Sequence, residues 1–244
     1  MLLRRLTTHV RSQNWFAVGI DFVIVVVGIF VGLQVDAWNE DRKERIRERA
    51  AVEQLIADFT TNGETVNRMV EFHEEKIKEI KFAVDALTSG ELAPEDASRF
   101  RNAFISMFQL PPLGATMGGY EAMIASGDFA LIQDQKLKSM LVNLDADLEA
   151  ERSMLNYFRD MNSSQITLPA KELILVVPNE GKTNASLQVD FEAAKNDLRI
   201  LTIVAGQRRN HQVFASIRGN LATGFADAGT YIKQRFDAQE TPTH

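Results

Sequence analysis

The feature that most constrains this chain is an apolar segment near its start that is bounded by two tryptophans. The segment from Trp15 to Trp38 reads WFAVGIDFVIVVVGIFVGLQVDAW, and its middle, from Phe22 to Leu33, is unbroken by a polar side chain. As a helix it would cover roughly 34 Å, slightly more than the ~30 Å hydrocarbon core of a bilayer. Indole rings favour the two headgroup levels. The sequence therefore predicts one transmembrane helix over residues 15–38, between a short basic tail of residues 1–14 and an ectodomain of residues 39–244.

A cleaved signal peptide is the alternative interpretation, because residues 35–37 could form a small-residue cleavage site after a basic start. Asp21 inside the apolar region is unusual for such a peptide. The orientation of the helix in the membrane is predicted from lysine and arginine, which are enriched on the cytoplasmic side of a span. The tail carries basic residues and no acid, whereas the basic residues after the span alternate with acids. We expect a cytoplasmic N-terminus and an ectodomain on the other side of the membrane.

The ectodomain is predicted to be all-α, with the transmembrane helix continuing into a long-helix bundle of about four main helices. Proline is absent between the span and Pro94, so the first helix should continue to Ser89 and Gly90. Its apolar positions follow a heptad-like seam that could pack within the chain or against a copy. The seam positions are Val52, Ile56, Phe59, Gly63, Val66, Val70, His73, Ile77, Ile80, Val84 and Leu87.

Further helices are expected over residues 94–110, over 119–126 with a stop at Gly127, from an N-cap at Asp134 towards Pro169, and over 190–236. A break in the last one is possible near Gly206 or Gly219. Residues 111–114 should form a loop and 178–189 a polar loop. The run 173–177 is too short to assign to helix or strand.

Charge and composition exclude several functions. With 27 basic and 33 acidic residues the net charge is −6, so nucleic-acid binding is not expected. Cysteine is absent, and no triad or carboxylate pair has a usable spacing. We predict no catalytic residue, no metal and no cofactor, and therefore no enzyme.

Polar residues interrupt two helical seams and form a possible polar layer of the bundle: His73, Gln207, Arg208 and His211. The two histidines could meet across the bundle. A buried polar pair that sets the helix register is favoured over a metal site, which would need further ligands. The alternative is that the residues around Gln207 bind an anion.

One face of the span carries small and acidic residues. Asp21, Gly28, Gly32 and Asp36 share this face, and Gly28 with Gly32 forms a GxxxG pair that lets two helices approach closely. An acid within the membrane is costly unless it is paired or wetted. We therefore expect a homo-oligomer through this face, with a lone span as the alternative. Asp21 could also carry ions in a motor-like complex.

The anchor resembles that of a family of bacterial single-span membrane proteins known as a domain of unknown function. The matching residues are Asp21, Gly28-Ile29, Leu33-Gln34, Trp38-Asn39-Glu40, and, in a second segment, Gly119-Tyr120-Glu121, Ser126-Gly127 and Leu131-Ile132. In the family the first acid is often glutamate, and Met123 stands where leucine is common. The resemblance implies a helical protein of the bacterial inner membrane, with its ectodomain in the periplasm, and implies no activity or substrate.

These patterns predict a membrane-anchored helical scaffold or interaction protein. Its expected partners are the lipid bilayer, a second copy and an unidentified membrane complex. The alternative is an accessory subunit of an ion-coupled or sensory membrane complex that uses Asp21 or a ligand site in the ectodomain.

Overall fold

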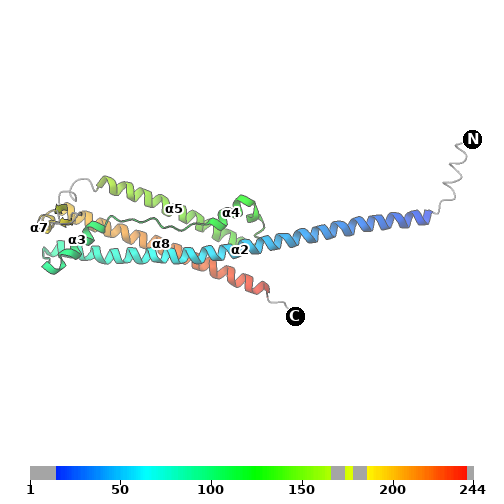
Figure 1. Ribbon diagram of the computed structural model, residues 1–244, viewed down its shortest axis with the longest axis horizontal. Coiled ribbons are helices and arrows are strands. Elements are labelled where there is room, and N and C mark those ends of the chain that lie inside the picture. Colours follow the sequence, from blue (N-terminus) through cyan, green and yellow to red (C-terminus); the bar gives the residue numbers. More distant parts are fainter. Residues whose placement is uncertain (1–14, 166–173, 178–185, 241–244) are drawn as a thin grey trace, which may run out of the picture. The chain divides into compact units, whose positions relative to one another are not determined.

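The computed structural model describes residues 15–165, 174–177 and 186–240, and almost all of them are helical (Figure 1). The long helices are α2 (Trp15–Ser89), α5 (Gln135–Gln165) and α8 (Leu198–Glu240). The short elements are η1 (Pro94–Asp96), α3 (Ala97–Ser106), α4 (Gly118–Ser126), η2 (Asp128–Ala130), β1 (Ile174–Val177), β2 (Ser186–Val189) and α7 (Phe191–Lys195). The predicted all-α class is confirmed. The predicted tail, residues 1–14, lies outside the described residues.

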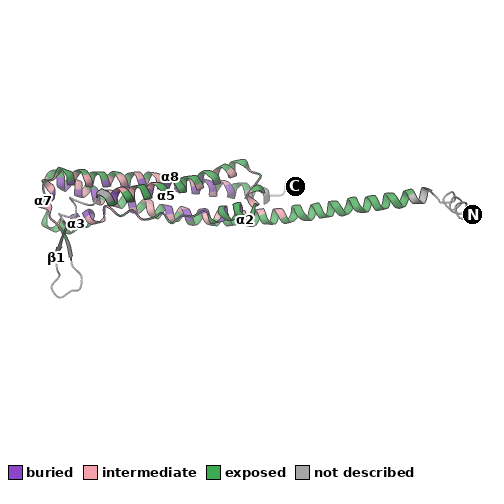
Figure 2. Cartoon of the chain, turned by 90° about the horizontal axis from the view of Figure 1, so that it is seen from above, coloured by how far each residue is buried: buried purple, intermediate pink, exposed green. Residues whose placement is uncertain are grey.

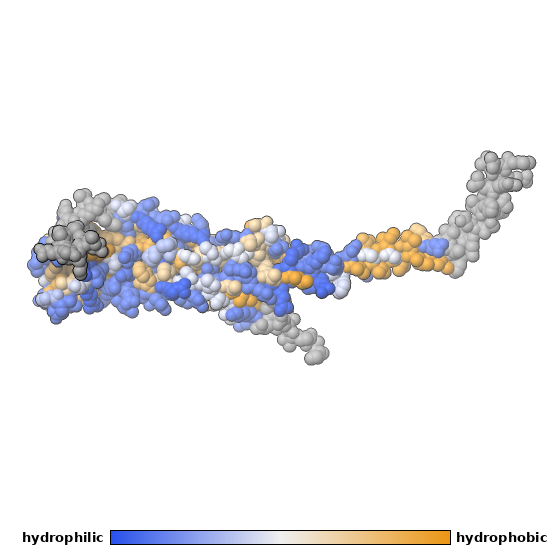
Figure 3. Space-filling model, in the orientation of Figure 1, coloured by the Kyte–Doolittle hydropathy of each residue, from blue (hydrophilic) through white to orange (hydrophobic). Residues whose placement is uncertain are grey.

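The chain divides into a unit of residues 1–50 and a unit of residues 51–244. In the first unit, the apolar part of α2 is exposed along its described length, as the green colour in Figure 2 and the orange band in Figure 3 show. Among the described residues, α2 is the one helix long and apolar enough to cross a membrane, and none of its apolar window is buried by protein. The predicted span is therefore a candidate membrane helix that no described part of the chain covers.

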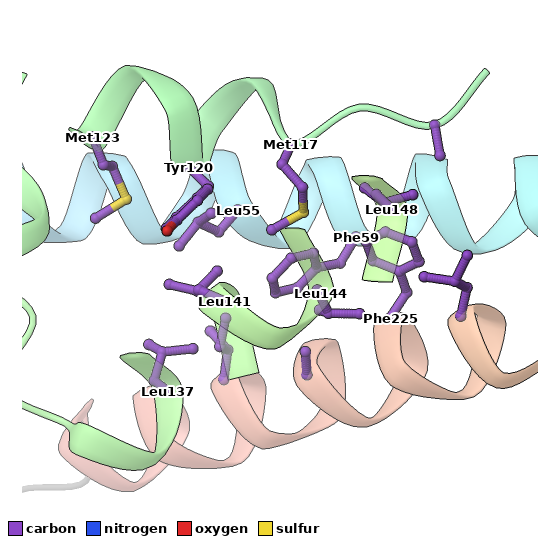
Figure 4. Packing of buried hydrophobic residues seen from close by; sticks show 14 of the residues in the cluster. Leu55, Phe59, Met117, Tyr120, Met123, Leu137, Leu141, Leu144, Leu148 and Phe225 are labelled. Atoms are coloured by element: carbon purple, nitrogen blue, oxygen red, sulfur yellow. The ribbon is translucent and has the colours of Figure 1, made fainter. Parts of the chain in front are cut away.

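The second unit is built from α2, α5 and α8, whose buried residues recur at alternating spacings of three and four. This period places one stripe of each helix in the core. The stripe of α5 is Leu137, Leu141, Leu144, Leu148, Glu151, Leu155 and Asn162, and that of α8 is Ile200, Val204, Gln207, His211, Phe214, Arg218, Leu221, Phe225, Ala228 and Ile232. Figure 4 shows Leu144 and Leu148 of α5 beside Phe59 and Phe225, in the same core cluster as Leu137 and Leu141.

The predicted seam of α2 is half right. Every seventh position from Val52 to Leu87 is buried, as predicted. The predicted positions between them are partly exposed to solvent, and at three places the preceding residue is buried instead. The partly exposed positions are Ile56, Gly63, Val70, Ile77 and Val84, and the buried ones are Leu55, Asn62 and Ala83. Neighbouring apolar residues make both registers possible in sequence. The partners packed around α2 select one.

Helix ends follow local signals. Gly90 and Gly127 adopt φ values of +73° and +82°, the left-handed conformation that ends α2 and α4. Asp134 caps α5 by accepting hydrogen bonds from the backbone N–H groups of Lys136 (2.9 Å) and Leu137 (3.0 Å). These three predictions are confirmed.

The last helical region breaks earlier than predicted. Helix α8 runs without interruption through Gly206 and Gly219, and the break falls between α7 and α8. Asp197 accepts a hydrogen bond from the backbone N–H of Arg199 (2.9 Å), so this side chain caps the new helix and sets the break.

The described part of the second unit also contains two short strands. β1 and β2 pair antiparallel, with Ile174 opposite Val189 and Val177 opposite Ser186. The undecided run 173–177 is therefore strand at 174–177. The prediction of a polar loop over 178–189 is wrong for its last four residues, because pairing with β1 supplies the backbone hydrogen bonds that make them a strand.

Candidate functional site

An extended segment, residues 107–117, connects α3 to α4 and lies against the bundle core; we call it the strap. Met107, Leu110, Leu113, Ala115 and Met117 of the strap are buried. Because the strap is neither helix nor strand, its backbone N–H and C=O groups need partners from elsewhere when they are removed from water. Polar side chains of the three long helices supply many of those partners.

Helix α2 holds the end of the strap. The side chain of Asn62 donates to the carbonyl of Thr116 (2.7 Å) and accepts from its N–H (3.2 Å), as a neighbouring strand would. One turn away, Asp58 accepts a hydrogen bond from the N–H of Gly119 (2.6 Å) at the start of α4. Asn62 is 5% exposed, so this polar seam position is occupied by an amide that serves the strap.

Helix α5 holds two further carbonyls. Arg159 donates to the carbonyl of Leu110 through Nη2 (2.8 Å) and Nε (3.2 Å), and Arg152 Nη2 donates to that of Ala115 (3.3 Å). Guanidinium groups suit this task because they carry several donors in a fixed fork and no acceptor.

The first part of the strap rests on a buried network of four ionisable side chains: His73, Glu151, His211 and Arg218. Each is at most 1% exposed. Arg218 donates to Glu151 Oε1 through Nε (2.9 Å) and Nη2 (2.6 Å), to the carbonyl of Pro111 (2.8 Å), and through Nη1 to His73 Nε2 (2.9 Å). His73 Nδ1 lies 2.7 Å from His211 Nδ1, and His211 Nε2 lies 3.1 Å from the carbonyl of Met107.

The contacts of the network fix the tautomer of each imidazole. Arg218 has donors only, so His73 Nε2 must accept and the His73 proton must lie on Nδ1. That N–H donates to His211 Nδ1, which places the proton of His211 on Nε2, where it donates to the carbonyl of Met107. The result is a directional chain from Arg218 through two neutral histidines to the strap.

Burial keeps both histidines neutral. Burial lowers the pKa of His73 to about 3, assisted by the nearby Arg218 and by His211. Its ring stacks against Phe214, with centroids 5.6 Å apart, and the side chain has no exposure to solvent. Burial also lowers the pKa of His211, although its bond to Met107 acts in the opposite direction. With both rings neutral, the charged groups of the network are the ion pair of Arg218 and Glu151 (2.6 Å).

The four predicted polar residues do not form one layer. His73 and His211 meet as expected. Gln207 belongs to a separate contact three turns along α5 from Glu151, where its Nε2 donates to Asn162 Oδ1 (2.9 Å). Arg208 is half-buried and is not part of either hydrogen-bonded group.

Sequence reasoning missed Glu151 and Arg218. A signal for both was present, because Glu151 lies three residues after Leu148 and four before Leu155, and Arg218 lies four after Phe214 and three before Leu221. Both positions continue the core period of their helix. Charged residues are rarely buried unless they are paired, and the pairing partner of each lies 67 residues away in sequence.

The predicted association face lies on the exposed part of α2. Asp21, Gly28, Gly32, Asp36 and Trp38 are exposed, and a Cβ atom added at either glycine would meet nothing within 4 Å. Trp15 begins α2, and its side chain lies outside the described residues. The face is thus open to a lipid or to another helix.

Within the described ranges, no cluster of three or more histidine, aspartate or glutamate side chains could hold a metal ion. Comparison with known protein families and with curated proteins gives no match for the chain. The resemblance of the anchor to a bacterial membrane family therefore stays a prediction, and the function rests on the geometry.

Proposed function

We propose that this protein is a membrane-anchored scaffold that presents a helical bundle at a bilayer surface and pairs with a second copy through its span. The observation that supports this proposal is the exposed apolar stretch of α2, where Phe22, Phe30 and Leu33 are each more than 60% exposed. A continuous apolar surface of this kind marks a membrane or protein contact, and its length matches a bilayer.

Self-association is supported by the face that carries Gly28 and Gly32. Lipid provides no hydrophobic drive between helices, so close backbone approach at small residues supplies the contact. Asp21 lies near Gly28 on the helical wheel, and a partner helix or trapped water at this face would reduce the cost of an acid in the membrane. We place the N-terminus in the cytoplasm and the ectodomain in the periplasm of a bacterial inner membrane, following the basic tail and the family resemblance.

A pair of glycine variants tests the proposal in the full chain. Gly28→Leu blocks close approach on the association face. Gly19→Leu is the matched control, because Gly19 precedes Gly28 by nine residues and so faces the opposite side of the helix, and it too has open space around it. Both variants are solubilised from membranes in a mild detergent, and the protein mass is measured by light scattering.

We expect wild type and Gly19→Leu to share an oligomeric mass and Gly28→Leu to be smaller. An unchanged mass for Gly28→Leu, or a smaller mass for both variants, contradicts association through this face. Recovery of the full chain in the supernatant after ultracentrifugation of lysed cells contradicts the membrane anchor itself.

A further inference from the structure

The first half of the strap, residues 107–111, is held in three ways. Arg159 binds the carbonyl of Leu110, the side chain of Met107 packs in a large core cluster, and the buried network binds two further carbonyls. The buried side chain of Leu110 packs in a small cluster with Leu155 and Phe214, separate from the two larger cores. Two carbonyls of this half, those of Met107 and Pro111, are bound by His211 and Arg218. These two hydrogen bonds belong to one connected series of side chains, so the loss of one weakens the other.

In this hydrogen-bonded series from Arg218 to Met107, no imidazole nitrogen is free to take up another proton. Each imidazole has one accepting nitrogen, and each accepting nitrogen already faces an N–H group: His73 Nε2 faces Arg218 at 2.9 Å, and His211 Nδ1 faces His73 at 2.7 Å. Protonation of either ring would set two donors against each other at hydrogen-bond distance, and one of the contacts would have to open.

The surrounding charges do not compensate such a proton. On α2, Lys76 lies in an ion pair with Glu79 (2.6 Å) and also binds Ser106 (3.0 Å). Lys76 and Arg218 both disfavour a charge on His211, while Glu79 favours it.

From α5, Arg159 adds a further cation that acts on Arg218. The one buried carboxylate of the network, Glu151, already accepts two bonds from Arg218 through Oε1. A proton on a histidine therefore adds positive charge to a group that is already rich in cations.

We propose that His73 and His211 form an acid-sensitive latch, whose protonation opens the hydrogen-bonded series from Arg218 to Met107 and loosens residues 107–111 against the bundle while the long helices stay folded. The latch is a property of the ectodomain and is independent of the proposed function. Opening exposes Leu155 and Phe214, the apolar side chains that Leu110 covers.

The size of the effect follows from the proton affinities. His73 lies on α2 and not in the strap, so its pKa rises towards the ordinary value of about 6.5 only as far as opening admits water to the ring, whereas its pKa in the closed state is about 3. The closed state therefore loses relative stability as the pH falls below 6.5. By linkage the opening constant should rise between pH 7.5 and pH 5, by up to about 30-fold from His73 when the ring is fully hydrated in the open state.

The chain contains no cysteine, so a single introduced thiol reports one site. Leu110→Cys probes the strap. Leu221→Cys in α8 is the matched control, because it makes the same substitution at an equally buried leucine, 3% exposed against 6%. Full-length protein in detergent is labelled with 4,4′-dithiodipyridine at pH 7.5 and pH 5, and each rate is divided by that of the urea-unfolded protein at the same pH.

We expect the protection of the thiol at position 110 to fall by severalfold, and by up to about 30-fold, at pH 5, with no change at position 221. The response at position 110 should disappear when His73→Gln and His211→Gln are introduced together, because glutamine keeps hydrogen-bonding groups and does not titrate. Unchanged protection at position 110 overturns the proposal, and so does an equal loss at both positions, which indicates global unfolding.

A pH response that survives in the double glutamine variant also overturns it. Where that variant does not fold, the comparison of positions 110 and 221 in the chain with both histidines decides the matter.

Discussion

Arg218 is a cation that the bundle buries completely, and replacing it with methionine tests what holds the core of the second unit together. The substitution leaves Glu151, which is 1% exposed, without its partner. Removing one member of a buried ion pair costs about 3 to 5 kcal/mol. The carbonyl of Pro111 also loses its donor, at about 1 to 3 kcal/mol for a buried unsatisfied group. We expect Arg218→Met to destabilise the second unit by roughly 4 to 8 kcal/mol.

The double variant separates these two costs. Glu151→Leu alone leaves the buried guanidinium of Arg218 without its carboxylate and should lower the free energy of unfolding by about 3 to 5 kcal/mol. In the double variant no buried charge remains, so the ion-pair cost disappears and about 1 to 3 kcal/mol should remain for the Pro111 carbonyl. Glu151→Leu should therefore rescue most of the damage done by Arg218→Met, with a coupling free energy of about 4 kcal/mol or more.

Urea unfolding of full-length protein in a mild detergent, followed by far-ultraviolet circular dichroism, provides the four free energies of unfolding. The reasoning is refuted if Arg218→Met costs less than about 1 kcal/mol, the range of an exposed ion pair, or if the two single effects simply add.

Two further predictions concern contacts outside the network. Gly119→Ala should lower the free energy of unfolding by about 1 to 3 kcal/mol, because its Cβ would lie 2.7 Å from Asp58 Oδ2. Gly118→Ala is the control and should be close to neutral, because open space surrounds Gly118. Equal effects of the two variants in urea unfolding would disprove the argument. Asp134→Ala should lower the free energy of unfolding by about 0.5 to 2 kcal/mol, because α5 loses its N-cap. Tyr231→Phe removes a 2.8 Å hydrogen bond to the same carboxylate, and it should lower the melting temperature less than Asp134→Ala does. A larger effect of Tyr231→Phe would show that capping α5 is not the main role of Asp134.

The heptad period shows how far pattern reasoning reaches. It located the three long helices, because burial of one stripe every 3.6 residues is a property of each helix alone. It placed half of the α2 seam one residue too late, since Leu55 and Ile56 are both apolar, as are Ala83 and Val84. The choice between such neighbours depends on the direction in which the partners lie.

The strap shows where pattern reasoning fails. Two consecutive prolines at Pro111 and Pro112 predicted a loop over residues 111–114. The prediction that the preceding helix reaches residue 110 is wrong, because α3 ends at Ser106 and residues 107–117 are non-helical. The pattern did not show that this loop is buried, because burial required donors from Arg159 and Arg218, which lie 49 and 107 residues away in sequence. The strand at residues 186–189 was missed for the same reason, since its hydrogen bonds come from β1.

Helical period, the apolar stretch, the glycine stops and the aspartate caps are local properties, and the amino-acid sequence alone determined them because each acts within a few residues of itself. The tertiary structure decided the register of α2, the pairing of Arg218 with Glu151 and the tautomers of His73 and His211. These depend on which side chains meet across the bundle, and a buried charge or imidazole acquires its state from partners that the chain brings together only on folding.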